Sequence, residues 1–406
     1  MPQIAGKNGK KEQKRTILEI QNNFSRQILS IFATKAKIGC VSAISSKLDC
    51  ARLLLSLHQN TIPMTTAIVI LNWNGKPFLE KFLPSLIENS YLPNVTIVVA
   101  DNGSTDGSQE WVKSNHPAVK LIEFEKNNGY TGGYNKALAL IEADYFLLLN
   151  SDIEVSTDWL PPLIEAMDND PRIGICMPKI RSFNDKEYFE YAGACGGFID
   201  RFGYPFCRGR ILSHIEKDEG QYNQPCEIFW ASGAAFMIRS SLFRQMGGFD
   251  DLFFAHMEEI DLCWRAKCNG WKVCVVPQST VYHVGGGTLP NDSPHKLYLN
   301  YRNNLLMLYK NLPGKSLYPI LLSRIFLDAT SAIIFLFQRK TALFKAIWQA
   351  HCGFFKMKNK AVRNPGTTLT PSKIYQEMGG RYRGSIVFSF FFSRKKVKFS
   401  DLTKIR

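Results

Sequence analysis

The 406-residue sequence has no Cys-x-x-Cys pair, although it contains 10 cysteines. The closest trio, Cys263, Cys268 and Cys274, has the spacing of neither a zinc finger nor a zinc ribbon. The first residues also lack the pattern of a secretory signal peptide. We therefore expect reduced thiols and a cytosolic compartment, and we expect no zinc-stabilised module.

Acidic residues are scarce at both ends of the chain. Residues 1–63 hold 10 Lys and Arg against 3 Asp and Glu, and residues 339–406 hold 16 against 2, whereas residues 64–338 hold 24 against 30. A centre with net negative charge argues against a nucleic-acid groove, so no nucleic-acid partner is expected. Basic ends beside apolar segments favour an anionic membrane surface, with simple solvation of the tails as the alternative.

A charge-free apolar run of membrane-spanning length is missing as well. Residues 317–337 are long enough to span a bilayer, but they contain Arg324 and Asp328. Each would cost about 2.5–3.5 kcal/mol at the centre of a span, and their i,i+4 spacing allows them to pair on one helix face. We expect a helix that lies in the membrane interface or packs on the domain.

Strands and helices alternate from residue 66 onward. Short apolar runs that end in polar turns predict strands, and the segments between them have helical periodicity. The fourth predicted strand covers residues 144–155, and an acidic helix is expected from about Glu258 to Asn269. Near-continuous apolar strands joined by helices indicate a mostly parallel, Rossmann-like sheet covered on both faces. Ligands bind such sheets at the carboxyl ends of the strands, where we place Asn72, Asp101, Asn127 and Asp152.

Three parts of the chain differ in composition. Residues 1–63 have few Gly and Pro and end just before Met64, so we interpret Met64 as the functional start and the preceding residues as an extension or an upstream translation artefact. Residues 64–312 carry the strand and helix alternation, and residues 313–406 form a basic, apolar and helical region.

Carboxylates and one histidine provide a dispersed set of metal and acid–base groups. Asp152 and His283 follow predicted strands, and a diphosphate-bound Mg²⁺ or Mn²⁺ needs only one or two protein carboxylates. Glu258, Glu259 and Asp261 begin the acidic helix, where one of them can deprotonate a hydroxyl. Taken singly, each has a structural alternative in an exposed helix face, a helix-terminus charge or a core hydrogen bond.

Five ordered blocks resemble the inverting glycosyltransferases of family 2, in particular the bacterial rhamnosyltransferase-like branch. The blocks are VILNWNG, VADNGSTDGS, NNGYTGGYNKAL, LLLNSDIEV and GGFDDLFFAHMEEIDLCWRAKCNGW, followed by YHVGGGT, and the resemblance covers roughly residues 66–310. It implies the GT-A nucleotide-diphospho-sugar transferase fold with a helical C-terminal extension.

The resemblance also implies roles for individual residues. Glu259 takes the position of the catalytic base, with Glu258 and Asp261 as alternatives. The metal motif becomes Asn150-Ser151-Asp152, so Asp152 and His283 are the implied ligands of Mg²⁺ or Mn²⁺. The residues implied to bind the nucleotide-sugar are Asn72, Asp101, Asn128, Gly129, Gly132, Gly133, Asn135, Ser151, Trp230, Ser232 and Gly233.

The expected activity is metal-dependent, inverting transfer of a sugar, with rhamnose as a candidate, from an NDP-sugar to a saccharide or lipid-linked saccharide in cell-surface polysaccharide synthesis. The expected location is the cytoplasmic face of the membrane, with peripheral association. A sugar nucleotidyltransferase is one alternative, but the turn after the first strand has only Lys76 and one glycine for a triphosphate. A non-catalytic carbohydrate-binding or scaffolding homologue is the other alternative.

Overall fold

The computed structural model describes residues 64–285, 293–364, 375–394, 396–403 and 405. The predicted extension, residues 1–63, lies outside the described residues. The described part of the chain begins at Met64.

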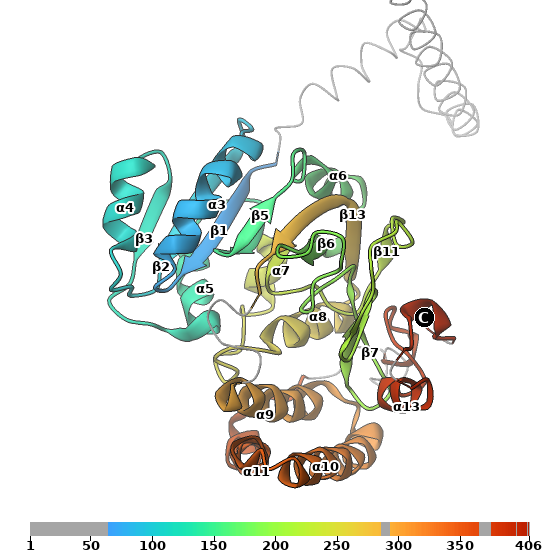
Figure 1. The fold of residues 1–406 in the computed structure, drawn as a ribbon. Coiled ribbons are helices and arrows are strands. Elements are labelled where there is room, and N and C mark those ends of the chain that lie inside the picture. The colour runs from blue at the N-terminus through green and yellow to red at the C-terminus, as the bar shows by residue number, and fades with distance from the viewer. Residues whose placement is uncertain (1–63, 286–292, 365–374, 395, 404, 406) are drawn as a thin grey trace, which may run out of the picture. The chain divides into compact units, whose positions relative to one another are not determined.

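The first half of this part alternates strands and helices, because apolar runs with a strand pattern are separated by amphipathic segments. Its elements are β1 (Thr66–Asn72), α3 (Lys76–Asn89), β2 (Val95–Asp101), α4 (Ser108–Asn115), β3 (Lys120–Glu123), α5 (Gly129–Ala139), β4 (Tyr145–Asn150), β5 (Ile153–Val155), α6 (Pro161–Asn169) and β6 (Ile173–Ser182). Figure 1 shows α3 and α4 beside β1, β2 and β3.

The second half completes the main sheet and adds a smaller one. Its elements are β7 (Gly197–Ile199), β8 (Pro205–Cys207), β9 (Arg210–Ile211), β10 (His214–Ile215), β11 (Cys226–Glu227), β12 (Ala235–Arg239), α7 (Ser240–Gln245), α8 (Glu258–Cys268), β13 (Lys272–His283), α9 (Pro294–Asn311), α10 (Gly314–Phe337), α11 (Thr341–Met357), η1 (Lys358–Lys360), α13 (Ile386–Phe392) and η2 (Phe399–Asp401).

The main sheet has the strand order β11-β13-β6-β12-β4-β1-β2-β3, with β5 paired to the end of β13. Strands β4, β1, β2 and β3 are parallel neighbours, and β6 is parallel to β13, whereas β12 runs antiparallel between β4 and β6. The predicted mostly parallel sheet covered by helices is confirmed. Its strands are buried because helices cover the sheet, as near-continuous apolar strands require.

The predicted fourth strand is in fact two strands. Strand β4 ends at Asn150, a turn takes Ser151 and Asp152, and β5 then pairs antiparallel with β13, so that Ile153 faces His283. The apolar alternation continues through the turn, which is why the sequence pattern alone reads as one strand. This break carries Asp152 from the edge of β4 to the end of β13.

The smaller sheet, β7 to β10, is formed by the chain between β6 and β11. The end of the chain packs against it, since the ring of Phe399 lies 4.7 Å from that of Phe198 and 6.2 Å from that of Phe206. The backbone N–H of Ile386 also donates to the buried carboxylate of Asp200 at 3.1 Å.

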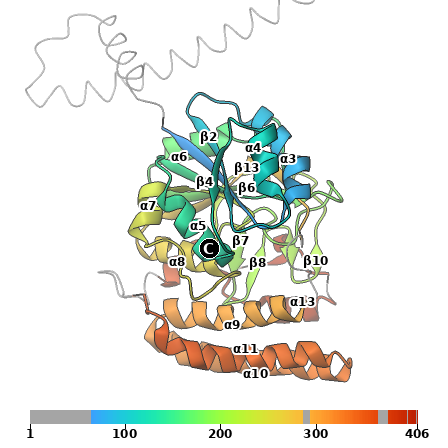
Figure 2. The same ribbon diagram turned by 90° about the vertical axis from the view of Figure 1, so that its left-hand side faces the viewer.

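Helices α9, α10 and α11 form a layer next to α8, and Figure 2 shows the three running side by side. Arg324 and Asp328 of α10 are both buried and pair at 3.3 Å, as their i,i+4 spacing predicted. In the described residues α10 is the one helix long and apolar enough to cross a membrane.

Candidate active site

The carboxyl ends of the parallel strands meet at one edge of the sheet. Asn72 at the end of β1 is level with Asp101 at the end of β2, and Leu71 is level with Asn150 at the end of β4. The backbone N–H of Asn150 in turn donates to the carbonyl of Ala234, just before β12. This edge therefore joins the first strands to the turn that precedes β12.

Asp101 and Asn72 form a buried pair at this edge. The Asn72 Nδ2 amide donates to Asp101 Oδ2 at 2.9 Å, while Ser104 N and Gln109 Nε2 donate to Asp101 Oδ1 at 2.9 and 2.7 Å. Asn72 Oδ1 is buried and has no hydrogen-bond partner in the described part of the chain. A buried acceptor without a partner is costly and marks a site that a ligand donor can complete.

Gly75 keeps this site open. A Cβ atom at Gly75 would lie 2.5 Å from Asn72 Oδ1 and 3.2 Å from Ser151 Oγ. The structure thus brings the predicted residues Asn72, Asp101 and Ser151 together around a glycine.

The glycine-rich block at the start of α5 packs tightly against its neighbours. Gly129 has φ +73°, and a Cβ there would lie 2.6 Å from the ring of Phe254. A Cβ at Gly133 would lie 2.8 Å from Leu71, whereas Gly132 has more room. These glycines allow α5 to approach both β1 and the loop before α8.

Two asparagines of the same block make hydrogen bonds within the protein. The N–H of Asn128 donates to Asn102 Oδ1 at 3.0 Å. Asn135 accepts from Phe249 N at 2.9 Å and donates to Asp251 Oδ1 at 2.9 Å, so it holds the loop that leads to α8.

That loop enters α8 through strained backbone. Phe254, His256 and Met257 all have positive φ, a conformation that costs side-chain-bearing residues on the order of 1 kcal/mol or more each. Asn303 of α9 holds the loop, because its Nδ2 amide donates to the carbonyls of Phe253, Ala255 and His256 at 2.9, 2.8 and 2.8 Å.

Glu258 and Glu259 stand at the first turn of α8, and Oε2 of each lacks a hydrogen-bond partner among the described residues. Burial raises the pKa of Glu259 to about 7, against the opposing effect of backbone hydrogen bonds. Burial, with the nearby charges of Glu259 and Asp261, raises the pKa of Glu258 well above its usual range. A carboxylate with a pKa near neutrality is suited to accept a proton at physiological pH.

Asp261 has a different environment. It accepts from Arg265 at 2.8 Å, Lys310 at 3.0 Å and Asn311 at 2.7 Å, so neither carboxylate oxygen lacks a partner. These cationic partners outweigh burial, and the pKa of Asp261 is lowered. Its carboxylate joins α8 to α9.

Gly233 brings Glu259 close to α5. A Cβ at Gly233 would lie 3.1 Å from Tyr130 Oη and 3.8 Å from Glu259 Cγ, and the Tyr130 hydroxyl donates to the Gly233 carbonyl at 2.7 Å. Burial raises the pKa of Tyr130 well above its usual range, and the charges of Tyr134, Glu258 and Glu259 add to the effect. Tyr130 was missed from the sequence, although its place in the glycine-rich block was a usable signal.

Trp230 and Ser232 face the interior of the protein. The Trp230 indole N–H donates to the Phe198 carbonyl at 2.9 Å, and its ring is 4% exposed. The Ser232 hydroxyl donates to the Ala192 carbonyl at 2.7 Å. Both side chains thus fix the turn that presents Gly233.

Asp152 and His283 lie together at the other end of the site. His283 Nε2 is 3.2 Å from Asp152 Oδ1, and His283 Nδ1 is 3.4 Å from Glu190 Oε1. The second contact is an ion pair by distance but lacks hydrogen-bond alignment. Burial opposes the charged imidazole, yet the two carboxylates raise the pKa of His283 to about 10. Glu190 was not predicted, because residues far from the motifs carry no local signal for it.

No group of three or more His, Cys, Asp or Glu side chains arranged to hold a metal ion is found in the described residues. The pair Asp152 and His283 nevertheless offers a carboxylate and an imidazole to one point, with Glu190 behind the imidazole. A carboxylate behind a histidine ligand is the usual support for metal binding. The donor set therefore fits a Mg²⁺ or Mn²⁺ ion whose remaining ligands come from phosphate and water.

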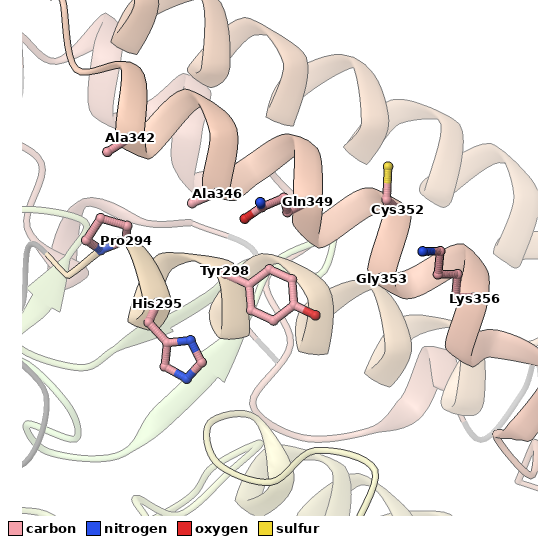
Figure 3. Close-up of a pocket in the computed structure, with 9 residues that line it drawn as sticks. All are labelled: Pro294, His295, Tyr298, Ala342, Ala346, Gln349, Cys352, Gly353 and Lys356. Atoms are coloured by element: carbon pink, nitrogen blue, oxygen red, sulfur yellow. The ribbon is translucent and has the colours of Figure 1, made fainter.

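A hollow of about 560 Å³ lies apart from these residues, between α9 and α11. Figure 3 shows its lining, which contains none of the predicted site residues. The lining residues are Pro294, His295, Tyr298, Ala342, Ala346, Gln349, Cys352, Gly353 and Lys356.

Comparisons with known proteins bear on the whole arrangement. Residues 67–247 match the model of glycosyl transferase family 2. The chain is similar to the N-acetylglucosaminyl-diphospho-decaprenol L-rhamnosyltransferase of Mycobacterium tuberculosis, with 27% identity over 59% of this chain and 83% of the relative. It is also similar to the low-salt glycan biosynthesis hexosyltransferase Agl10 of Haloferax volcanii, with 24% identity over 61% of this chain and 76% of the relative.

Among solved structures, the chain resembles GalNAc-T7 crystallised with UDP, GalNAc and Mn²⁺. The TM-score is 0.50 with 17% identity, and the match covers 80% of this chain and 60% of that one. A likeness at this level concerns the fold alone.

Proposed function

We propose that this chain is a glycosyltransferase of family 2, in its rhamnosyltransferase-like branch, because residues 67–247 match the family model and the chain is 27% identical to a mycobacterial rhamnosyltransferase. The protein transfers a hexosyl group, with rhamnosyl as the first candidate, from an NDP-sugar to a hydroxyl of a saccharide or lipid-linked saccharide. The anomeric configuration is inverted in a single displacement.

The observation that carries the proposal is the state of Glu259. Its Oε2 is buried and has no hydrogen-bond partner among the residues that the structure describes, and its pKa of about 7 suits it to take a proton. Glu259 adjoins Gly233, whose neighbour Ala234 contacts the strand edge at Asn150. We assign Glu259 as the base that removes the acceptor hydroxyl's proton, so that the oxygen attacks the anomeric carbon and the nucleoside diphosphate departs.

The nucleotide part of the donor is assigned to the edge formed by β1 and β2. Asn72 Oδ1 needs a donor, which a base or ribose N–H or O–H supplies, and Asp101 holds the Asn72 amide in place. Ser151 and the start of α5 at Asn128 and Gly129 lie along the same edge.

Asp152 and His283 would hold a Mg²⁺ or Mn²⁺ ion, with Glu190 orienting the imidazole. When bound, such an ion neutralises charge on the diphosphate leaving group. Asn150 in the first position of the motif brings no charge, so Asp152 is the motif's single carboxylate.

The acceptor is proposed from the mycobacterial relative, whose name specifies a decaprenol-linked N-acetylglucosaminyl diphosphate. A lipid-linked acceptor requires the enzyme to work at a membrane surface. The basic, apolar C-terminal region supports peripheral association with the cytoplasmic leaflet.

A donor screen tests the reaction. Purified protein is incubated with UDP-, GDP- and dTDP-sugars and short saccharide acceptors, with Mg²⁺, Mn²⁺ or a chelator, and nucleoside diphosphate release is measured. We expect release with one donor class and loss of release with the chelator. Release from none of the donors, with nucleotide binding also absent by calorimetry, would overturn the proposal in favour of a scaffold.

A further inference from the structure

Helix α10 has Arg324 and Asp328 on its buried face and large apolar side chains on its exposed face. Its buried stripe is Leu317, Leu321, Arg324, Asp328 and Ala332, spaced by three or four residues and therefore on one face. This buried stripe contains the only ionic residues within the span from residue 317 to residue 337. A helix of a water-soluble protein normally has its charges outside and its large apolar side chains inside.

The inner face is held by specific contacts with the rest of the protein. The Arg324 guanidinium donates to Asn304 of α9 and lies 3.7 Å above the ring of Tyr204. Asp328 accepts from the Tyr204 hydroxyl at 3.2 Å and lies 3.3 Å from His351 of α11. Turning the helix over would leave the side chains of Asn304 and Tyr204, to which these two residues are hydrogen-bonded, without their partners in the interior, which is costly. The orientation of α10 is therefore firmly set.

The outer face is an exposed apolar surface. Its side chains are 45% to 85% exposed, and they are Tyr318, Leu322, Phe326, Ile333, Ile334, Leu336 and Phe337. Helix α11 adds Trp348 and Phe355, which are 67% and 50% exposed and lie on one side of the helix, about two turns apart. Contiguous exposed apolar surface of this kind marks a contact with another molecule or a membrane.

The charge around this apolar surface distinguishes a membrane from a second copy of the protein as its binding partner. Residues 314–364 contain nine Lys and Arg against one acidic residue, Asp328, which is buried. Lys315 lies at the start of α10, Arg339 and Lys340 follow its end, and Lys345 lies on α11. Two copies joined through this face would place like charges against each other, whereas an anionic lipid surface has the complementary charge.

We propose that the exposed faces of α10 and α11 dock into the interfacial region of an anionic membrane, with α10 lying along the surface and not across it. Crossing is excluded because the inner face stays bound to Asn304 and Tyr204. The proposal assigns the surface and the orientation, and it does not depend on the sugar-transfer reaction. Since α10 contacts α9 and α9 contacts α8, the helix that begins with Glu258 and Glu259 lies one helix away from the docking layer.

The test is flotation of the full chain with vesicles of phosphatidylcholine alone or with phosphatidylglycerol. We expect binding to the anionic vesicles that weakens as NaCl is raised, since the exposed basic groups are screened by salt. The double variant Leu322→Glu/Phe326→Glu should lower binding at least about tenfold, because it puts two carboxylates into an apolar, anionic interface. Both positions are 70% or more exposed, so folding is expected to be unaffected.

Tyr91→Glu/Leu140→Glu is the matched control, since both residues are exposed and lie outside α10 and α11. They follow the last residues of α3 and α5, before the amino ends of β2 and β4. It should bind vesicles like the parent protein. Equal binding by the α10 variant and the parent overturns the proposal. The proposal is also overturned if the parent protein does not bind vesicles and light scattering shows that it is a dimer, whereas the α10 variant is a monomer. No donor is needed, so a failed donor screen and a failed flotation are separate results.

Discussion

Replacement of Glu259 by Gln should make the protein more stable at pH 8 while it removes most of the activity. The substitution keeps the shape of the side chain and deletes a charge that the fold buries near Gly233. The folded-state pKa of about 7 lies above the ordinary value of 4.5, so the folded protein binds the proton more tightly than the unfolded chain does. Stability is therefore lost as pH rises from 4.5 through 7, and the loss is complete above that window.

The magnitude of the destabilisation by ionised Glu259 follows from the shift of its pKa. A rise of about 2.5 units at about 1.36 kcal/mol per unit corresponds to up to ~3 kcal/mol of destabilisation above pH 7, less because the side chain is partly exposed. Glu259→Gln should recover this at pH 8 and nothing at pH 4. Turnover should fall about 10²–10⁴-fold, the usual contribution of a general base. In the parent protein kcat/KM should rise with pH up to about 7 and then level off.

Urea denaturation at pH 4 and pH 8, calorimetric donor binding and steady-state kinetics measure these effects. Asp261→Asn is the control with the opposite sign, because it removes the buried carboxylate that pairs with Arg265 and leaves Lys310 with Asp250 alone, and it should destabilise at pH 8. Turnover of Glu259→Gln within about threefold of the parent, with donor binding intact, would refute the assignment of the base and return the choice to Glu258.

Two further substitutions test the rest of the site. Asp152→Asn should abolish the rise in thermal stability that Mn²⁺ gives in the presence of nucleoside diphosphate. In the parent protein this rise is about 2.7 kcal/mol when the Mn²⁺ concentration is 100 times Kd. An equal Mn²⁺ effect in both proteins would contradict the metal assignment. Asn303→Ala should destabilise by about 2–3 kcal/mol and lower kcat, because the loop carbonyls of Ala255 and His256 lose their side-chain donor and that of Phe253 keeps only Arg302. Asn300→Ala, on the same helix, should change neither quantity in thermal melts and kinetics.

Local pattern was sufficient for the framework of the site. Strand ends with polar residues placed Asn72 and Asp101 at one edge, and the structure pairs them in register. The i,i+4 spacing of Arg324 and Asp328 likewise foretold their pairing, because helix geometry alone sets it.

Pattern was insufficient where the chain turns or where distant segments meet. The break at Ser151 and Asp152 is invisible to alternation, since apolar residues continue on both sides. Tyr130, Gly233 and Glu259 are joined only because β12 is inserted antiparallel beside β4, which brings its preceding turn to the same edge.

The sequence by itself determined the alternating fold, the strand edge at which we place a ligand and the acidic helix, because periodicity and turn chemistry are local. The tertiary structure alone decided which carboxylates are free. It ties Asp261 to Lys310, leaves Glu259 Oε2 without a partner among the described residues, and sets Glu190 behind His283. It also turned the charges of α10 inward. Burial and partnership depend on which segments pack together, and this is settled by long-range contacts that no short stretch of sequence contains.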